Sequence, residues 1–182
     1  MGLNLKRHET SAAEAVREVS VEIDWLGPDR LVLTYELVGD LSQILVPVAV
    51  PPARTDNLWH HTCLEAFIRV EGAENYIEFN LSPSTAWAAY RFDAYRQGMA
   101  DLDVPAPTVM TELWSDRLRL TAYLSLAGAP LDLSAVLRLS ATAIVEEADG
   151  AKAFWALTHP PGQPEFHHVD GFSHRIPPSD RP

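Results

Sequence analysis

The sequence has little cysteine: one residue in 182, Cys63. A single thiol excludes an internal disulfide and any metal site built from several cysteines. We expect Cys63 to be a buried, reduced thiol, because free cysteines are among the most buried residues in proteins. A Gly-rich phosphate loop and a Gly-x-Ser-x-Gly elbow are also missing. Nucleotide binding and serine-hydrolase chemistry therefore have no support.

Positive charge and long apolar runs are scarce. The chain has 14 Lys and Arg against 25 Asp and Glu, a formal net charge of −11. Phosphate backbones and anionic lipid need a clustered cationic patch, so we expect neither nucleic acid nor a membrane as partner. The longest apolar run, 44–50, contains Pro47 and is far shorter than the roughly 20 residues that cross a bilayer. No apolar segment follows Lys6 and Arg7 as in a secretory signal, and we expect a cytoplasmic protein.

The sequence does have a period-two alternation of apolar and polar residues in short segments bounded by turn residues, which is typical of antiparallel sheets. Ten segments predict strands, at 19–25, 31–37, 43–50, 63–70, 76–82, 86–92, 108–114, 118–126, 137–146 and 152–157. Only 11–19 hints at a helix. We therefore predict an all-β fold, an antiparallel β-sandwich of jelly-roll type with about ten strands and little helix.

The domain organisation follows from length and from the absence of any internal repeat or linker. A chain of 182 residues is within the usual size of one domain with one core. The last residues are polar and rich in proline, a composition that packs poorly. We predict a single domain over 1–175, followed by a flexible C-terminal tail at 176–182.

Two neighbouring predicted strands, 63–70 and 76–82, combine an apolar face with a polar one. Because side chains alternate across a strand, Glu65 would share a face with Glu78 and Asn80, while their apolar neighbours turn to the core. Carboxylates and an amide on a rigid sheet can hold a polar ligand by hydrogen bonds. The same spacing also fits an ordinary solvated face with an Arg69–Glu78 ion pair, so both interpretations stay open.

The next predicted strand adds one of its two faces to this patch, either the one with Trp87 and Arg91 or the one with Tyr90. We assign Trp87 to stack on a ligand and Arg91 to fix an anionic group, with Trp59 and His167 at the rim. The predicted ligand-binding residues are therefore Trp59, Glu65, Glu78, Asn80, Trp87, Arg91 and His167.

Other chemistries remain open. Glu65 and Glu78 could form the acid pair of a glycoside hydrolase, although such pairs are common among 25 acidic residues. The histidines at 60, 61, 159, 167, 168 and 174 could hold a divalent metal with Glu165 or Asp170, although no spacing matches a zinc pattern. A sheet face or edge strand could instead dock another protein.

Several short motifs follow one another along the chain: Gly39-Asp-Leu41, Asp56 to Phe67, Tyr76 to Ser84, Trp87 to Tyr90, Tyr95 to Met99, Phe154 to Leu157 and Pro164 to His168. In this order they resemble the DOMON-like proteins of bacteria, which are related in fold to family 9 carbohydrate-binding modules. The resemblance implies a β-sandwich of about ten strands whose relatives bind sugars or haem through one sheet face and its loops.

The resemblance also suggests residue roles. In haem-binding relatives a Met and a His ligate iron, a role that Met99 with His167 or His168 could take here. Sugar-binding relatives clamp the ligand with aromatic residues, for which Trp59 and Trp87 are the nearest candidates. We expect a non-catalytic domain that binds a small polar ligand, carbohydrate-like, without a cofactor. The alternatives are an enzyme that acts on a sugar derivative through the carboxylate pair or a His-bound metal, and a haem-binding or protein-interaction module.

Overall fold

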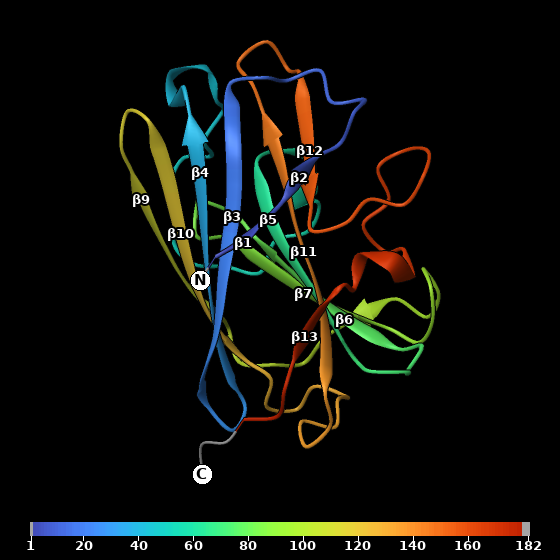
Figure 1. The fold of residues 1–182 in the computed structure, drawn as a ribbon. Helices are drawn as coiled ribbons and strands as arrows, with labels where there is room; N and C mark the ends of the chain where they lie inside the picture. The colour runs from blue at the N-terminus through green and yellow to red at the C-terminus, as the bar shows by residue number, and fades with distance from the viewer. Residues whose placement is uncertain (1, 180–182) are drawn as a thin grey trace.

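The computed structural model describes residues 2–179, which form two antiparallel sheets packed as a sandwich (Figure 1). The first sheet has the order β1 (Leu3–Asn4), β3 (Val16–Gly27), β4 (Arg30–Gly39), β10 (Arg117–Ser125) and β9 (Thr108–Leu113). The second has the order β2 (Lys6–Arg7), β12 (Lys152–Ala156), β11 (Leu137–Glu146), β5 (Cys63–Val70), β6 (Tyr76–Leu81), β7 (Trp87–Phe92) and β8 (Ala100–Asp101), and β13 (His174–Ile176) also pairs with β11. The predicted antiparallel sandwich is confirmed.

Helical structure within residues 2–179 is limited to three single 3-10 turns. They are η1 (Leu41–Gln43), η2 (Leu58–His60) and η3 (Val169–Gly171). No helix in this described part is long and apolar enough to cross a bilayer.

The core between the sheets is built by strand alternation. On β4 the inward residues Leu31, Leu33, Tyr35 and Leu37 are fully buried, while the residues between them are partly exposed. Tyr35 lies opposite Leu120 of β10, and its hydroxyl crosses the core to donate a 2.7 Å hydrogen bond to the carbonyl of Glu65 on β5. This bond ties the first sheet to the strand that carries the predicted site.

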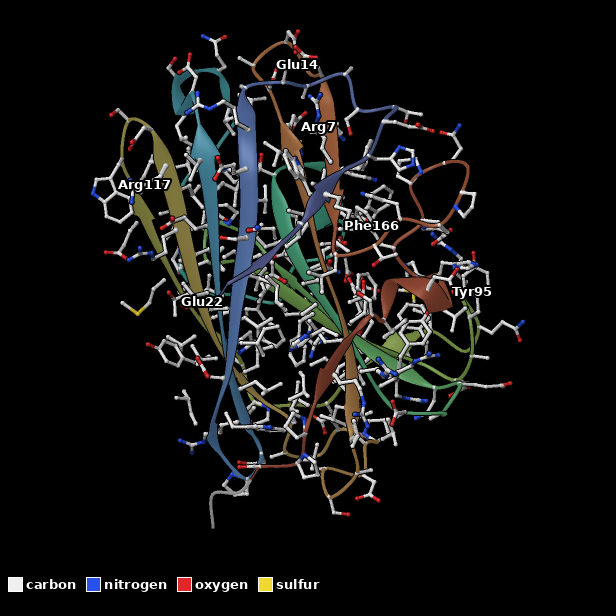
Figure 2. The ribbon with its side chains drawn as sticks, viewed as in Figure 1. Arg7, Glu14, Glu22, Tyr95, Arg117 and Phe166 are labelled. Atoms are coloured by element: carbon white, nitrogen blue, oxygen red, sulfur yellow. The ribbon has the colours of Figure 1, made fainter. Side chains whose placement is uncertain are left out.

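The second sheet is buried on both faces at β5 and β6. Its outer face carries a second apolar cluster, which contains Phe67, Tyr76, Tyr90 and Phe92 and is separate from the main core. Figure 2 shows Tyr95 and Phe166 over this outer side, with Arg117 on the far side of the sandwich. The segment that follows β12, red in Figure 1, passes over the same side. The predicted polar patch is therefore a covered sheet face.

Three predictions about secondary structure need correction. The segment 43–50 is not a strand but has one isolated bridge, Ile44 to Glu147, because prolines in and after it cannot donate ladder hydrogen bonds. The helix hint at 11–19 is wrong, since β3 begins at Val16 and pairs with Gly39. The predicted flexible tail was placed one residue too early, because Ile176 is buried and pairs with Leu137 of β11. Residues 180–182 of the predicted tail lie outside the described residues.

Candidate ligand-binding site

Strand register brings the predicted carboxyl and amide side chains together. Glu65 on β5 lies directly opposite Asn80 on β6, and Phe67 lies opposite Glu78. Glu65 and Glu78 are therefore diagonal neighbours on one face, at a separation that long side chains span. The alternation predicted from the sequence is confirmed for all three polar residues, because Leu64, Ala66 and Ile68 join the core instead.

The three polar side chains are buried rather than solvated. The exposed fractions of Glu65, Glu78 and Asn80 are 3%, 6% and 1%. The Asn80 amide donates a 2.7 Å hydrogen bond to Glu78 Oε1, and the Thr142 hydroxyl of β11 donates one of 2.9 Å to Glu65 Oε2. Both donors are neutral. The alternative of a surface Arg69–Glu78 ion pair does not fit, because the Arg69 guanidinium stacks on Phe172 instead.

Burial changes the protonation of this pair. Burial first, and then the charge of Glu78, raise the pKa of Glu65 to about 8 in spite of the hydrogen bond from Thr142. Burial also raises the pKa of Glu78 to about 7, against the lowering effect of Asn80 and Arg96. Near neutral pH the pair can therefore hold a proton, and it can both donate and accept hydrogen bonds.

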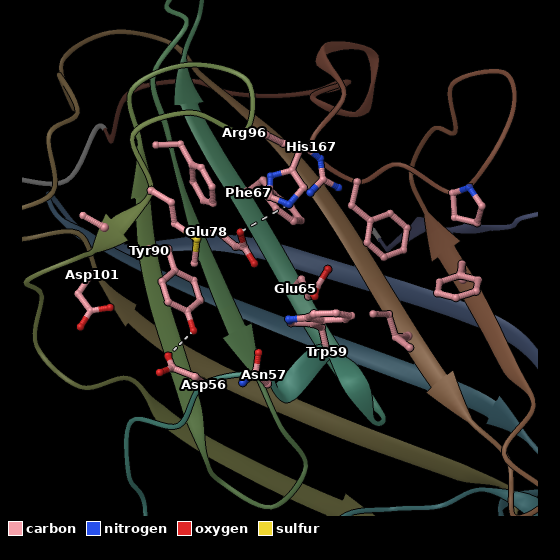
Figure 3. Close-up of a pocket in the computed structure, with 17 residues that line it drawn as sticks. Asp56, Asn57, Trp59, Glu65, Phe67, Glu78, Tyr90, Arg96, Asp101 and His167 are labelled. Atoms are coloured by element: carbon pink, nitrogen blue, oxygen red, sulfur yellow. Dashed lines mark hydrogen bonds and ion pairs between the residues drawn. The ribbon is translucent and has the colours of Figure 1, made fainter.

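A cavity of about 770 Å³ opens over the two carboxyls, and Figure 3 shows its lining side chains. Glu65 and Glu78 lie in its floor, and both β5 and β6 are covered by loops at its edges. Its aromatic lining consists of Trp59, Phe67, Tyr90, Phe92, Phe154 and Phe166. Its polar lining consists of Asp56, Asn57, Glu65, Glu78, Arg96, Asp101 and His167. This size and mixture of groups are typical of small-molecule sites.

The wall formed by residues 93–101 and 164–168 is held by polar contacts. Arg96 makes two hydrogen bonds to the Glu165 carboxylate, at 2.9 and 3.1 Å. The Tyr76 hydroxyl lies 2.8 Å from Nδ1 of His167 and accepts a 3.2 Å hydrogen bond from the backbone N–H of Arg96. One tyrosine from the sheet thus positions both loops.

His167 faces the floor of the cavity as a neutral group. Burial, followed by the charge of Arg96, lowers the pKa of His167 to about 4. Its Nε2 lies 3.9 Å from Oε2 of Glu78, which is longer than a hydrogen bond (Figure 3). Because a neutral imidazole brings no charge, His167 does not form an ion pair with the Glu78 carboxyl.

The opposite rim is formed by the residues before β5. Asn57 has a left-handed backbone (φ 61°), a conformation that asparagine adopts more readily than most residues, and it starts η2. This turn presents Trp59, whose exposed fraction is 48%, over the cavity mouth. Beside it, Asp56 accepts a 2.6 Å hydrogen bond from the Tyr90 hydroxyl (Figure 3).

The structure brings together most of the residues predicted from the sequence. Trp59, Glu65, Glu78 and His167 all line the cavity. Asn80 lies under the floor, where it holds Glu78. The placement of His167 at the rim is corrected, because it forms part of the inner wall.

Trp87 and Arg91 do not belong to this cavity, which corrects their predicted placement. Trp87 is 6% exposed and packs in the core between the sheets, with the Arg54 guanidinium 4.6 Å from its ring centre. Arg91 is exposed and pairs with Asp93 at 3.2 Å. Both side chains leave β7 on the face opposite to Tyr90, because residues an even number apart share a face.

Sequence reasoning missed several lining residues. Tyr90 and Phe92 belong to the other face of the same strand, which the alternation left open. Their pairing with Glu78 and Tyr76 depends on the 82–86 turn, whose register the sequence does not fix. Arg96 lies in a loop without periodicity and Asp101 in the two-residue strand β8, and no sequence signal marked either position.

The residues suggested for haem binding lie in two neighbouring hollows. Met99 and His167 both line the cavity, whereas His168 lines a smaller hollow beside it. Of the two ring nitrogens of His167, Nδ1 lies 2.8 Å from the Tyr76 hydroxyl, whereas Nε2 faces Glu78 in the cavity floor at 3.9 Å. Among residues 2–179, no three or more His, Cys, Asp or Glu side chains are grouped so that they could hold a metal ion.

Comparisons with known proteins show the fold. No family model matches the chain, and no curated protein matches it by sequence. A Bacteroides uniformis protein for which carbohydrate binding has been suggested superposes with a TM-score of 0.67 at 15% identity, over 93% of this chain and 82% of that one. The family 9 carbohydrate-binding module of Caldicellulosiruptor kristjanssonii also superposes on this chain, in two complexes with sugars. The complex with glucose has a TM-score of 0.53 at 14% identity and covers 94% of this chain and 82% of that one. The complex with cellotriose has a TM-score of 0.52 at 14% identity and covers 89% and 74%. The chain therefore has the fold of these modules.

Proposed function

We propose that this protein is a non-catalytic binding domain for a small carbohydrate, and that the cavity over Glu65 and Glu78 is its binding site. The observation that carries the proposal is the combination of two buried carboxyls in the cavity floor with aromatic rings on its walls. Sugar hydroxyls need fixed donors and acceptors, and the C–H faces of a sugar ring pack on aromatic side chains. The similarity in fold to sugar-bound modules supports the same function.

Each part of the cavity has a role in this proposal. Glu65 and Glu78 exchange hydrogen bonds with sugar hydroxyls and fix the orientation of the ring. Trp59 covers one face of the ring from the exposed rim, and Tyr90 lines the cavity beside it. Arg96 and His167 close the side away from Trp59 and exclude water. A DOMON-like relationship is part of the proposal, and no cofactor is needed for it.

An enzyme is the second candidate, because a carboxyl pair with pKa values near neutral is also what acid–base catalysis uses. The two proposals differ in what happens to the sugar. Binding without catalysis leaves an oligosaccharide unchanged after prolonged incubation, which NMR of the recovered ligand measures.

Isothermal titration with glucose, cellotriose and a panel of other mono- and disaccharides tests the proposal. We expect saturable binding of at least one sugar, and a loss of that binding in Glu78→Gln/Glu65→Gln with little change in the melting temperature at pH 6. The matched control is Glu112→Gln on β9, an exposed carboxylate of the first sheet. An absence of saturable binding across the panel would overturn the proposed function.

A further inference from the structure

The charges that line the cavity do not balance. Four acidic side chains, Asp56, Glu65, Glu78 and Asp101, line it against one permanently charged base, Arg96. Arg96 donates two hydrogen bonds to Glu165, a carboxylate outside this set of four, so its charge is already matched. Asp101 is also matched, by the Arg54 guanidinium at 3.9 Å, so the excess of acidic groups in the cavity is confined to Asp56 and the two floor carboxyls.

The two floor carboxyls are the part of this excess that is buried. Among the described residues, the Glu65 carboxyl receives one hydrogen bond, from Thr142 to Oε2, and its second oxygen has no donor. Although the exposed fraction of Glu65 is only 3%, this oxygen is open to the cavity, where a ligand can reach it. Glu78 accepts from the Asn80 amide, again a neutral group. Buried carboxylates in proteins are normally paired with a cation, whereas here the cation that acts on Glu78, Arg96, donates its hydrogen bonds to Glu165 instead.

The walls of the cavity also suit a cation. Trp59, Tyr90 and Phe92 present aromatic rings above and beside the carboxyls. The negative face of an aromatic ring attracts an ammonium group, and the attraction is strongest where water is excluded. Neutral sugars use such rings for packing alone, whereas a ligand with an ammonium group gains from the rings and from both carboxyls.

We infer that the cavity selects a sugar that carries an ammonium group, with the ammonium held by the Glu65 and Glu78 carboxyls and the sugar ring held against the aromatic walls. This inference rests on the proposed function and narrows its ligand class. The ammonium supplies the donor that Glu65 lacks, and the hydroxyls of the ring contact the rim residues.

Binding of the ammonium group should release protons, because it changes the carboxyls from the protonated to the ionised form. Below the raised pKa values of the pair, binding of an ammonium favours the ionised carboxyls and releases protons to the solution. The other titratable or charged groups that face the pair are Cys63, Tyr35, Tyr76, Tyr90, Arg96 and His167. Burial raises the pKa of the thiol and of the three phenols and lowers the pKa of His167. The thiol, the phenols and the imidazole are therefore neutral near pH 6, and Arg96 keeps its charge.

Titration calorimetry at pH 6 with glucosamine, glucose and N-acetylglucosamine tests the inference. At this pH the amine of glucosamine is protonated, whereas the N-acetyl group is neutral. We expect glucosamine to bind at least about tenfold more tightly than the two neutral sugars. In two buffers of different ionisation heat, we expect proton release with glucosamine and none with glucose. Cyclohexylamine tests whether an ammonium suffices without a sugar, and we expect it to bind more weakly than glucosamine.

Variants of the two glutamates test whether their carboxyls cause the preference for glucosamine. Glu65→Gln and Glu78→Gln keep shape and remove charge, and each should reduce the preference for glucosamine over glucose, while Glu112→Gln leaves it unchanged. Equal affinity for glucose and glucosamine in the wild type would overturn this inference and leave the proposed function in place. Cyclohexylamine binding as tight as glucosamine would overturn the assignment to a sugar. Failure of all the sugars would overturn both.

Discussion

Glu65 lies directly opposite Thr142 across the β5–β11 pair and accepts a 2.9 Å hydrogen bond from its hydroxyl. Threonine supplies no positive charge, so an ionised Glu65 is buried beside a second carboxyl, Glu78, without a cation. A low-dielectric environment disfavours the charged form of a carboxyl. The stability of the fold therefore depends on pH through this pair.

The free energy of unfolding should fall by several kcal/mol, about 6 if both groups contribute in full, as the pH rises from about 5 to about 9. An unfolded glutamate titrates near pH 4.3, whereas the pKa values in the fold are about 8 for Glu65 and about 7 for Glu78. Between these limits the folded protein binds more protons than the unfolded chain, so raising the pH favours unfolding. Below them both states are protonated and the effect disappears. Urea unfolding at pH 5, 7 and 9 measures it.

The matched variants assign this pH dependence to the pair. Glu65→Gln/Glu78→Gln removes both titrating groups and should flatten the curve between pH 5 and 9, while raising stability at pH 9. Glu112→Gln, which changes an exposed carboxylate, should keep the wild-type slope. A double variant with the slope of the wild type would contradict this explanation.

Trp59 and Trp114 have similar exposure but different surroundings, which makes them a matched pair. Their exposed fractions are 48% and 43%, and Trp59 lines the cavity whereas Trp114 follows β9 in the first sheet. We expect Trp59→Ala to weaken sugar binding by about 1–2 kcal/mol, roughly 5- to 30-fold, with little change in stability. Trp114→Ala should leave affinity unchanged. Titration calorimetry of both variants checks this, and an equal loss in both would count against Trp59 as a contact.

The positions of Trp87 and Arg91 give a test that separates the sequence-based site from the structural one. Trp87→Ala empties a buried volume and removes the ring on which the Arg54 guanidinium stacks, so it should destabilise the protein by about 3–5 kcal/mol. Arg91→Ala removes an exposed group that pairs with Asp93 and should change neither stability nor affinity measurably. Loss of sugar binding in a stable Arg91→Ala protein would restore Arg91 to the site.

Alternation made the floor of the cavity predictable, because a period of two leaves each side chain one of two faces. Glu65, Glu78 and Asn80 follow directly from it once their apolar neighbours are assigned to the core. The same rule failed at β7 because its two faces are similarly apolar, and the turn before it fixes which one faces the cavity. That turn contains Thr85 with φ 76°, a left-handed conformation that is uncommon for threonine and that sequence patterns do not mark.

The covering of the site could not be predicted, because it depends on contacts between distant segments. Tyr76 and His167 are 91 residues apart, and Arg96 and Glu165 are 69 apart. Neither loop has a hydrophobic period that predicts where it folds back. For the same reason the sequence left open whether the carboxyls were solvated, and with it their raised pKa values.

The Tyr76 hydroxyl should control the order of the cavity wall. Tyr76→Phe keeps the ring stacked on Phe92, with centroids 4.6 Å apart, and removes the contacts to His167 and to the backbone of Arg96. We expect faster amide hydrogen exchange in residues 93–101 and 164–168, with unchanged exchange in the β3–β4 hairpin. Sugar affinity should fall by about 1 kcal/mol, because the wall is less well ordered before binding. Unchanged exchange in both loops would show that other contacts hold the wall.

Gly98 is the position where the loop that carries Arg96 tolerates no side chain. Its φ is +65°, and a Cβ added there would overlap the Asp93 side chain. Gly72, in the β5–β6 turn, has a similar φ of +83° but open space around its Cβ position. Gly72→Ala therefore measures the backbone strain alone, about 1 kcal/mol, whereas Gly98→Ala adds a collision with the Asp93 side chain, which has to move away and disturbs the loop. We expect Gly98→Ala to lower sugar affinity several-fold more than Gly72→Ala, at similar melting temperatures. Equal affinities would mean that the position of this loop does not affect binding.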